Sequence, residues 1–106
     1  MPKYLFKVSY TAEGARGVAK EGGSSRRDMV VKLAQNSGGT MESFYFAFGE
    51  SDAYVVVDMP DNTTAAAVAL AVNSTGAATL ETVVLVTPEE VDEATKKTVD
   101  YRPPGG

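Results

Sequence analysis

The feature that most constrains the fold is a change of hydrophobic period along the chain, from a period of two to a helical period and back. Residues 4–10, 41–48 and 53–59 alternate between two kinds of side chain. An alternation of this kind is typical of a β-strand whose two faces meet different surroundings. Residues 80–86 predict a fourth strand. Helical patterns occupy the stretches between the first and second strands and between the third and fourth.

Two helical patterns separate the first two strands, with a pair of glycines between them. Residues 11–20 contain two glycines of their own, which lower the helix propensity. A new helix is expected to begin near Ser25, which with Asp28 resembles a capping box. Gly38 marks the end of this helix.

The second half of the chain predicts two more helices. Residues 61–76 are rich in alanine, and Asp61 or a nearby threonine is the expected N-cap. The sequence Thr-Pro-Glu-Glu at residues 87–90 is a strong start signal, because threonine caps, proline suits the first turn and the last glutamate reaches back. This short helix is expected to run to about Val99, and residues 101–106 to form an extended tail.

The order of these elements predicts an α+β fold of the ferredoxin-like kind, βαββαβ followed by a short C-terminal helix. Such a fold has a four-stranded antiparallel sheet with helices on one face. The expected strand order is 4-1-3-2, because each β-α-β crossover leaves room for one strand between its ends. Residues 1–106 are expected to form a single domain. A tight hairpin at residues 49–52 is expected to join the second and third strands, with a positive φ at Gly49.

The two faces of this sheet are expected to differ in character. The predicted helix-covered face carries Phe6, Val8, Phe44, Phe46, Val55 and Val57. The other face carries Leu5, Lys7, Ser9, Tyr45, Tyr54, Val56 and Asp58. This second mixture is too apolar for open exposure and too polar for a core, so we expect it to be covered by another copy of the chain. The alanine-rich helix, apolar on all sides, offers a second contact surface.

The absence of two residue types restricts the chemistry. The chain contains no histidine and no cysteine. It therefore has no Ser-His-Asp triad, no cysteine nucleophile, no disulfide and no thiolate or imidazole metal ligand. Acid–base chemistry would fall to Asp, Glu, Lys or Tyr, and a metal site would need oxygen ligands alone. We expect neither a metal site nor a cofactor.

Charge and hydropathy disfavour other classes of partner. The net charge is −4, with both signs scattered and no basic stripe. Nucleic acid and anionic membranes are therefore not expected partners. The longest apolar run, residues 65–72, is too short to cross a bilayer. The lack of cysteine and of a signal-peptide pattern leads us to expect a cytoplasmic protein.

Two acidic residues near the third strand are candidates for a ligand site. Asp58 is expected to share a face with Lys7 and to form a cross-strand or intersubunit ion pair; the alternative is a desolvated base in a pocket. Asp52 follows the hairpin tip, where such side chains commonly bond the backbone of the turn. Tyrosines and phenylalanines nearby either line an aromatic pocket between sheet and helix or belong to the core.

Two arginines at the start of the second helical pattern are further candidates. Arg26 and Arg27 follow the glycine pair, and backbone N–H groups with arginines can hold an anion there. The alternative is a solvated face on which one arginine pairs with Glu21 or Asp28. The candidate ligand-binding residues are Tyr45, Asp52, Tyr54, Asp58 and Arg27.

The stretch at residues 49–61 resembles the GYD domain family, small bacterial and archaeal proteins named for a Gly-Tyr-Asp motif. The similarity extends from residues 1–28 through 44–62 to 86–94 and 99–105, which is nearly the whole chain. The resemblance implies a ferredoxin-like or dimeric α/β-barrel fold. It implies no specific activity, since members are largely of unknown function.

The motif itself is only partly matched. Gly49 and Asp52 agree with it, whereas Ser51 stands where a tyrosine is expected. If the tyrosine does chemistry in relatives, this chain has lost that group unless Tyr54 substitutes for it. If the motif only shapes the hairpin, Ser51 is harmless. We favour the second interpretation.

Three functions remain open from the sequence. The first is a non-enzymatic homo-oligomeric module for small-ligand binding or assembly. The alternative is a cofactor-independent enzyme of the dimeric α/β-barrel kind, a monooxygenase, cyclase or isomerase acting on an aromatic or polyketide-like substrate. That alternative depends on Tyr45, Tyr54, Asp52 and Asp58, and ranks second because such enzymes often use a histidine. PII-like signalling through a trimer is third, because the chain lacks a long nucleotide loop.

Overall fold

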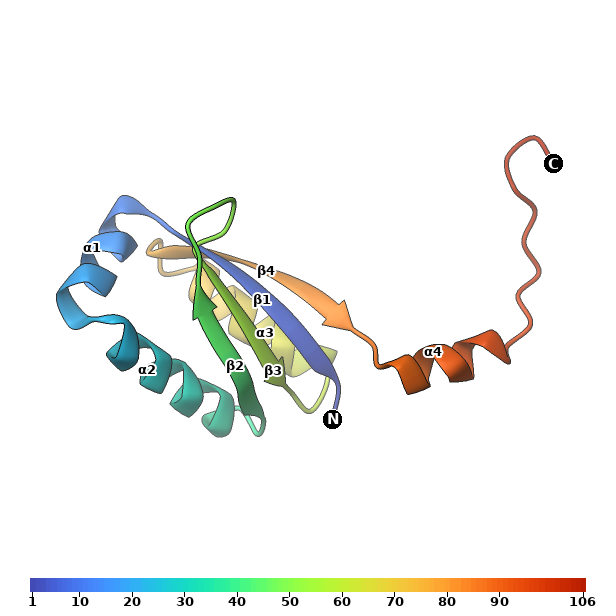
Figure 1. Cartoon of the computed structure of the whole chain (residues 1–106), viewed down its shortest axis with the longest axis horizontal. Coiled ribbons are helices and arrows are strands. Elements are labelled where there is room, and N and C mark those ends of the chain that lie inside the picture. The colour runs from blue at the N-terminus through green and yellow to red at the C-terminus, as the bar shows by residue number, and fades with distance from the viewer.

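The computed structural model describes all 106 residues and contains four strands and four helices. The elements follow one another in the order β1 (Lys3–Tyr10), α1 (Ala12–Glu21), α2 (Gly23–Asn36), β2 (Thr40–Phe46), β3 (Ala53–Asp58), α3 (Asn62–Asn73), β4 (Ala78–Leu85) and α4 (Pro88–Thr95). Helices α1, α2 and α3 lie on one side of the sheet, and α4 projects beyond it (Figure 1). No helix is long and apolar enough to cross a membrane.

The strands form one antiparallel sheet in the order β2-β3-β1-β4. This is the predicted order 4-1-3-2 seen from the other edge, so the predicted ferredoxin-like fold is confirmed. The two helical patterns predicted before β2 are confirmed as α1 and α2, and they are separated at Gly22, whose φ of 89° suits glycine. The predicted cap at Ser25 is wrong, because α2 already begins at Gly23 and has no side-chain cap.

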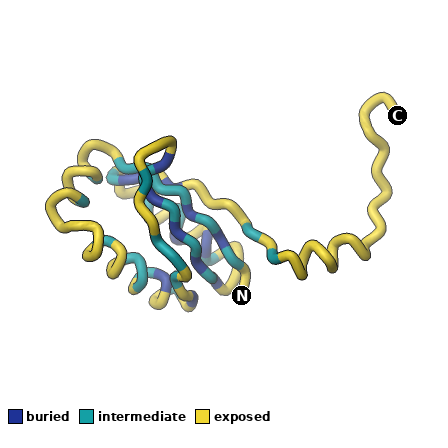
Figure 2. The backbone as a smooth tube through the Cα atoms, viewed as in Figure 1, coloured by how far each residue is buried: buried dark blue, intermediate teal, exposed yellow.

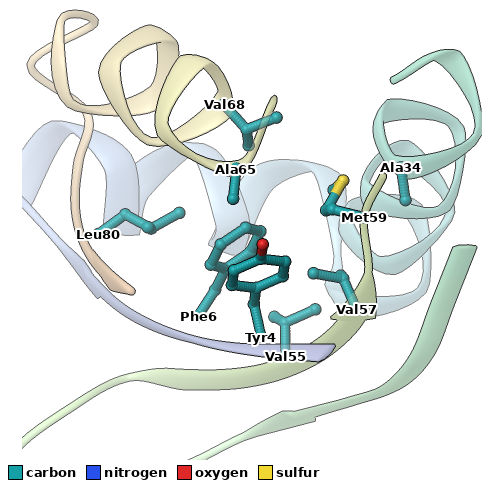
Figure 3. Close-up of a cluster of buried hydrophobic side chains, with 9 residues drawn as sticks. All are labelled: Tyr4, Phe6, Ala34, Val55, Val57, Met59, Ala65, Val68 and Leu80. Atoms are coloured by element: carbon teal, nitrogen blue, oxygen red, sulfur yellow. The ribbon is translucent and has the colours of Figure 1, made fainter. Parts of the chain in front are cut away.

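The apolar core lies between the sheet and the helices, as the alternating pattern predicts. Tyr4 and Val57 point from β1 and β3 toward Ala34 of α2 and Ala65 of α3, with Met59 closing the same end (Figure 3). All five of these side chains are at most 2 % exposed. Full burial of a side chain such as valine or methionine contributes about 1.5–3 kcal/mol.

Two helix starts behave as their sequences predict. Asp61 caps α3 by accepting a hydrogen bond from the Thr64 backbone N–H at 2.8 Å. Thr87 and Glu90 form the full capping box of α4, each side chain bonding the other's backbone N–H at 3.1 Å. These capping signals involve residues close together in the sequence, so they can be recognised without the tertiary structure.

The hairpin between β2 and β3 is longer than predicted. β2 ends at Phe46 and β3 begins at Ala53, so residues 47–52 form the connection. Phe48, which lies within the strand predicted for residues 41–48, is instead fully exposed in this loop. The predicted positive φ at Gly49 is also wrong, since the positive-φ glycines lie elsewhere.

The C-terminal arm, residues 86–106, leaves the body of the protein (Figure 1). The radius of gyration is 16.8 Å, whereas a compact chain of this length has about 13 Å. Nearly all of the arm is exposed (Figure 2), including Val86 and Val91 at 60 % and 48 %. Helix α4 ends at Thr95 rather than near Val99, and an extended tail follows.

Candidate functional site

The space between helices and sheet is filled at one end and hollow at the other. Helix α2 packs over the edge strand β2, and α3 packs over the opposite edge strand β4. Between them, above the central strands, lies a cavity of about 480 Å³ that is partly open to solvent. Small-ligand sites typically have volumes of roughly 300–1,000 Å³.

The walls of this cavity are mainly apolar, with fifteen hydrophobic residues among the twenty-one that line it. The strands form the floor through Phe6, Val8, Tyr10, Phe44, Val55, Ala78 and Leu80. The helices form the sides through Gly14, Gly17, Val18, Met29, Val30, Leu33, Val68, Ala71 and Val72. The charged residues of the wall are Glu13, Glu21 and Arg26. The site therefore suits a largely apolar molecule that carries few polar groups.

Glycines in α1 explain why the cavity is not filled by the protein itself. A Cβ added at Gly14 would lie 1.9 Å from the Ala77 carbonyl oxygen, so only glycine allows α1 to approach this close. Thr11 fixes the N-terminal end of α1 to the same oxygen, because its backbone N–H donates a hydrogen bond to it at 3.0 Å. A Cβ at Gly17 would meet nothing within 4 Å. The helix is held in place, yet no residue of it is buried.

Arg26 is the unusual polar residue of the cavity wall. Its side chain is half-buried, and its Nε atom is buried without a hydrogen-bond partner. It forms no ion pair, although Glu13 and Glu21 also line the cavity. A buried donor without a partner costs about 1–3 kcal/mol, and more when charged. An acceptor inside the cavity would pair with the part of the guanidinium that lines the cavity, which has no ion-pair partner in the chain.

Three of the predicted site residues lie on the opposite side of the sheet, which we call the outer face. Tyr45 of β2 stands directly across from Tyr54 of β3. Asp58 lies at the other end of β3 and accepts hydrogen bonds from the Lys3 ammonium at 3.1 and 3.2 Å. The predicted pairing with Lys7 is wrong in register, since Lys7 instead lies 3.6 Å from Glu81.

The Lys3 ammonium is the most strongly held charge on the outer face. It bonds Asp58 and also Glu42, the latter at 3.3 Å. The hydrogen bond to Asp58, followed by that to Glu42, raises the pKa of Lys3 above its ordinary value. This network occupies Asp58 within one chain, which supports the ion-pair interpretation of that residue over a free base.

Arg27, the fourth predicted site residue, lies on the exposed side of α2. Its guanidinium is 3.2 Å from the Asp28 carboxylate, which is one of the two pairings expected for a solvated face. Arg26 is the arginine that reaches the cavity. The sequence spacing in α2 could have distinguished the two arginines. Arg26 precedes Met29 by three residues and Val30 by four, so these three side chains share one face of the helix.

A comparison with models of protein families assigns the chain to a family. The model of the GYD domain matches residues 4–95 of the 106-residue chain. The chain belongs to the GYD domain family. No curated protein and no solved structure matches it. The matched region of this GYD domain protein includes the sheet apart from Lys3 and every wall of the cavity, and it ends with α4.

The motif region of this GYD domain protein joins the hairpin to the central strand. The Asp52 carboxylate accepts a hydrogen bond from the Tyr10 backbone N–H at 2.8 Å. The Asp52 backbone N–H donates to the Val8 carbonyl, also at 2.8 Å. The Asp52 carboxylate therefore bonds the end of β1, whereas we had expected it to bond the backbone of its own turn. Ser51 beside it is 4 % exposed.

The five predicted residues therefore do not form one site. Tyr45, Tyr54 and Asp58 share the outer face, Asp52 secures the hairpin, and Arg27 lies on the surface of α2. None of them lines the cavity. Tyr10 and Phe44 do line the cavity. The sequence could not identify them as cavity residues, because that depends on which helix covers each strand.

Proposed function

We propose that this GYD domain protein is a non-enzymatic small-ligand-binding module that works as a homo-oligomer. The observation that carries the proposal is the apolar cavity of about 480 Å³ between α1, α2, α3 and the sheet. Water in contact with apolar walls is readily displaced by an apolar molecule. Binding at this site would therefore stabilise the folded chain.

The outer face supports the homo-oligomer. Apolar side chains lie there beside charges of both signs, with Leu5 between Val56 and Val83 across the strands. Tyr45 is 72 % exposed in the single chain. A second copy related by a two-fold axis would bring the same mixture against itself and cover the apolar residues of both copies.

The other exposed apolar surfaces are consistent with the same assembly. Leu70 on α3 is 71 % exposed, as the alanine-rich pattern of this helix led us to expect. Val84 and Val86 at the end of β4 are 57 % and 60 % exposed, where the C-terminal arm leaves the body. Isolated exposed apolar residues are common, but several on one small chain favour a covering partner.

An enzyme acting on the same apolar ligand is the second candidate. Tyr10 and Glu13 both line the cavity, and their side chains are able to move protons. Tyr45, Tyr54 and Asp58, which we had assigned to such an enzyme, lie on the other side of the sheet. Turnover of a bound ligand, lost in Tyr10→Phe and Glu13→Gln variants that still bind it, would favour this candidate.

A fluorescence titration with anilinonaphthalene sulfonate, an apolar anionic dye, tests the ligand-binding proposal. Gly17→Leu places a side chain in the empty space of the cavity and is expected to weaken dye binding at least tenfold. Ala15→Leu adds the same side chain to an exposed position of α1 and serves as the matched control. Equal dye binding by the wild type and both variants, or none by the wild type, would contradict the proposal.

The oligomer is tested separately by light scattering coupled to size exclusion at micromolar concentration. A mass of at least two chains is expected. A single-chain mass of 11.2 kDa would remove the homo-oligomer from the proposal and leave the ligand-binding part intact.

A further inference from the structure

We propose that the ligand is an apolar carboxylic acid, bound in its ionised form, whose carboxylate pairs with Arg26. This inference rests on the proposed ligand-binding function and specifies its ligand. The cavity supplies two requirements at once: mainly apolar walls, and one guanidinium whose Nε atom is buried without a partner.

The Nε atom of Arg26 has no hydrogen-bond acceptor within the chain. Water does not reach Nε, because the atom is buried, and no protein acceptor bonds it. Arg26 lines the cavity, so an acceptor that enters the cavity can reach its guanidinium. The guanidinium has no ion-pair partner in the chain, and a ligand acceptor in the cavity would supply one to the part of it that lines the cavity.

The charge around Arg26 favours a carboxylate over a phosphate. Glu13 and Glu21 also line the cavity, so the three charged side chains together carry a net charge of −1. This balance repels a dianionic phosphate more strongly than a monoanion. A carboxylate carries one charge, and its two oxygens match the planar fork of a guanidinium. The remaining apolar part of the ligand would lie against residues such as Phe6, Val30 and Phe44.

Arg27 provides an internal comparison for this inference. It is next in the sequence, exposed, and already paired with Asp28 at 3.2 Å. Arg26 is the less exposed of the two and has no partner. A purely structural arginine would be expected to resemble Arg27. Removing Arg26 should therefore affect ligand binding without lowering the stability of the empty protein.

Isothermal titration of octanoate and 1-octanol at pH 7 tests the inference. The two probes have the same number of carbons and differ in charge. Octanoate is expected to bind the wild type roughly tenfold or more tightly than octanol, because only octanoate can form a charge-assisted hydrogen bond with Arg26. Arg26→Met is expected to abolish this preference while its melting temperature stays equal to or above that of the wild type. Arg27→Met, the matched control, should keep the preference.

The possible failures are distinguishable. Equal binding of octanoate and octanol by the wild type overturns the carboxylate inference and leaves the ligand-binding function standing. A preference that persists in Arg26→Met also overturns it, because the anion would then be held elsewhere. If neither probe nor the dye binds, the proposed function fails as well. Should Arg26→Met not fold, the wild-type comparison still decides, and Arg26→Gln repeats the variant test.

Discussion

The two ends of the helix-covered face are built from similar side chains and reach opposite states. At the filled end, Tyr4, Val57 and Met59 are each 1 % exposed beneath Ala34 and Ala65. At the hollow end, Val8 and Tyr10 of β1 are only partly buried although Phe6 and Val55 beside them are buried, and α1 contributes no buried residue. An apolar face therefore indicates where a helix will lie, whereas the side chains on that helix decide whether the space beneath it is filled.

Removing an aromatic ring from each end is the strongest test of this comparison. Tyr4→Ala should lower the free energy of unfolding by about 4 kcal/mol, because it opens a void in a packed core. It also removes the hydrogen bond from the Tyr4 hydroxyl to Asn62. Tyr10→Ala at the hollow end should cost about 1 kcal/mol, since its ring is only partly buried. Urea unfolding measures both, and equal costs would refute the distinction between the ends.

The two glycines of α1 should respond to alanine with opposite signs. Gly14→Ala is expected to destabilise the chain by about 2 kcal/mol, because its Cβ would overlap the Ala77 carbonyl and force the helix away. Gly17→Ala should stabilise by about 1 kcal/mol, since the space is open and alanine favours helix. Thermal unfolding of the two variants and the wild type measures both changes in stability. Destabilisation by both would mean that the space beside Gly17 is closed in solution.

A change on the outer face should affect assembly more than folding. Tyr45→Glu is expected to weaken self-association by about tenfold or more, or about 1.4 kcal/mol, because it places a charge beside Tyr54 on the outer face. Phe48→Glu is the matched control, since Phe48 is equally aromatic and fully exposed in the hairpin loop. Sedimentation equilibrium measures both. An oligomer unaffected by Tyr45→Glu would place the contact elsewhere.

The smallest expected effect is a pH dependence at the start of α3, which belongs to the filled end. Hydrogen bonds from the Thr64 hydroxyl and then its backbone N–H lower the pKa of Asp61 below its ordinary value. A folded-state pKa below the unfolded one adds stability at neutral pH that is lost as pH falls through the folded value. Asp61→Asn keeps an acceptor without this titration. Its melting temperature should therefore fall less between pH 5 and about pH 2 than that of the wild type. Parallel curves for the two proteins would contradict this.

Much of the fold was predictable because its signals are local or strictly periodic. The alternation in β1 and β3 identifies their buried face, and the caps at Asp61 and Thr87 identify two helix starts. The errors fall where tertiary contacts decide. The hairpin loop is lengthened because Asp52 bonds the end of β1, and Asp58 pairs with Lys3 because of a register that no local pattern sets.

The candidate site was the least predictable part. The sequence singled out the arginine pair, and the helix phase shared with Met29 and Val30 would have selected Arg26. Nothing local shows that Gly17 faces open space or that α2 and α3 pack over opposite edges of the sheet.

The order of strands and helices and the apolar side of the sheet can be read from the amino-acid sequence, because backbone propensity and the period of the side chains depend on neighbours along the chain. The order of the motifs along the chain indicates the family. The position of the cavity and the arginine that lines it are visible only in the folded protein. Cavity volume is the small difference between the space that helices enclose and the volume of side chains that enter it, and it depends on residues far apart in the sequence.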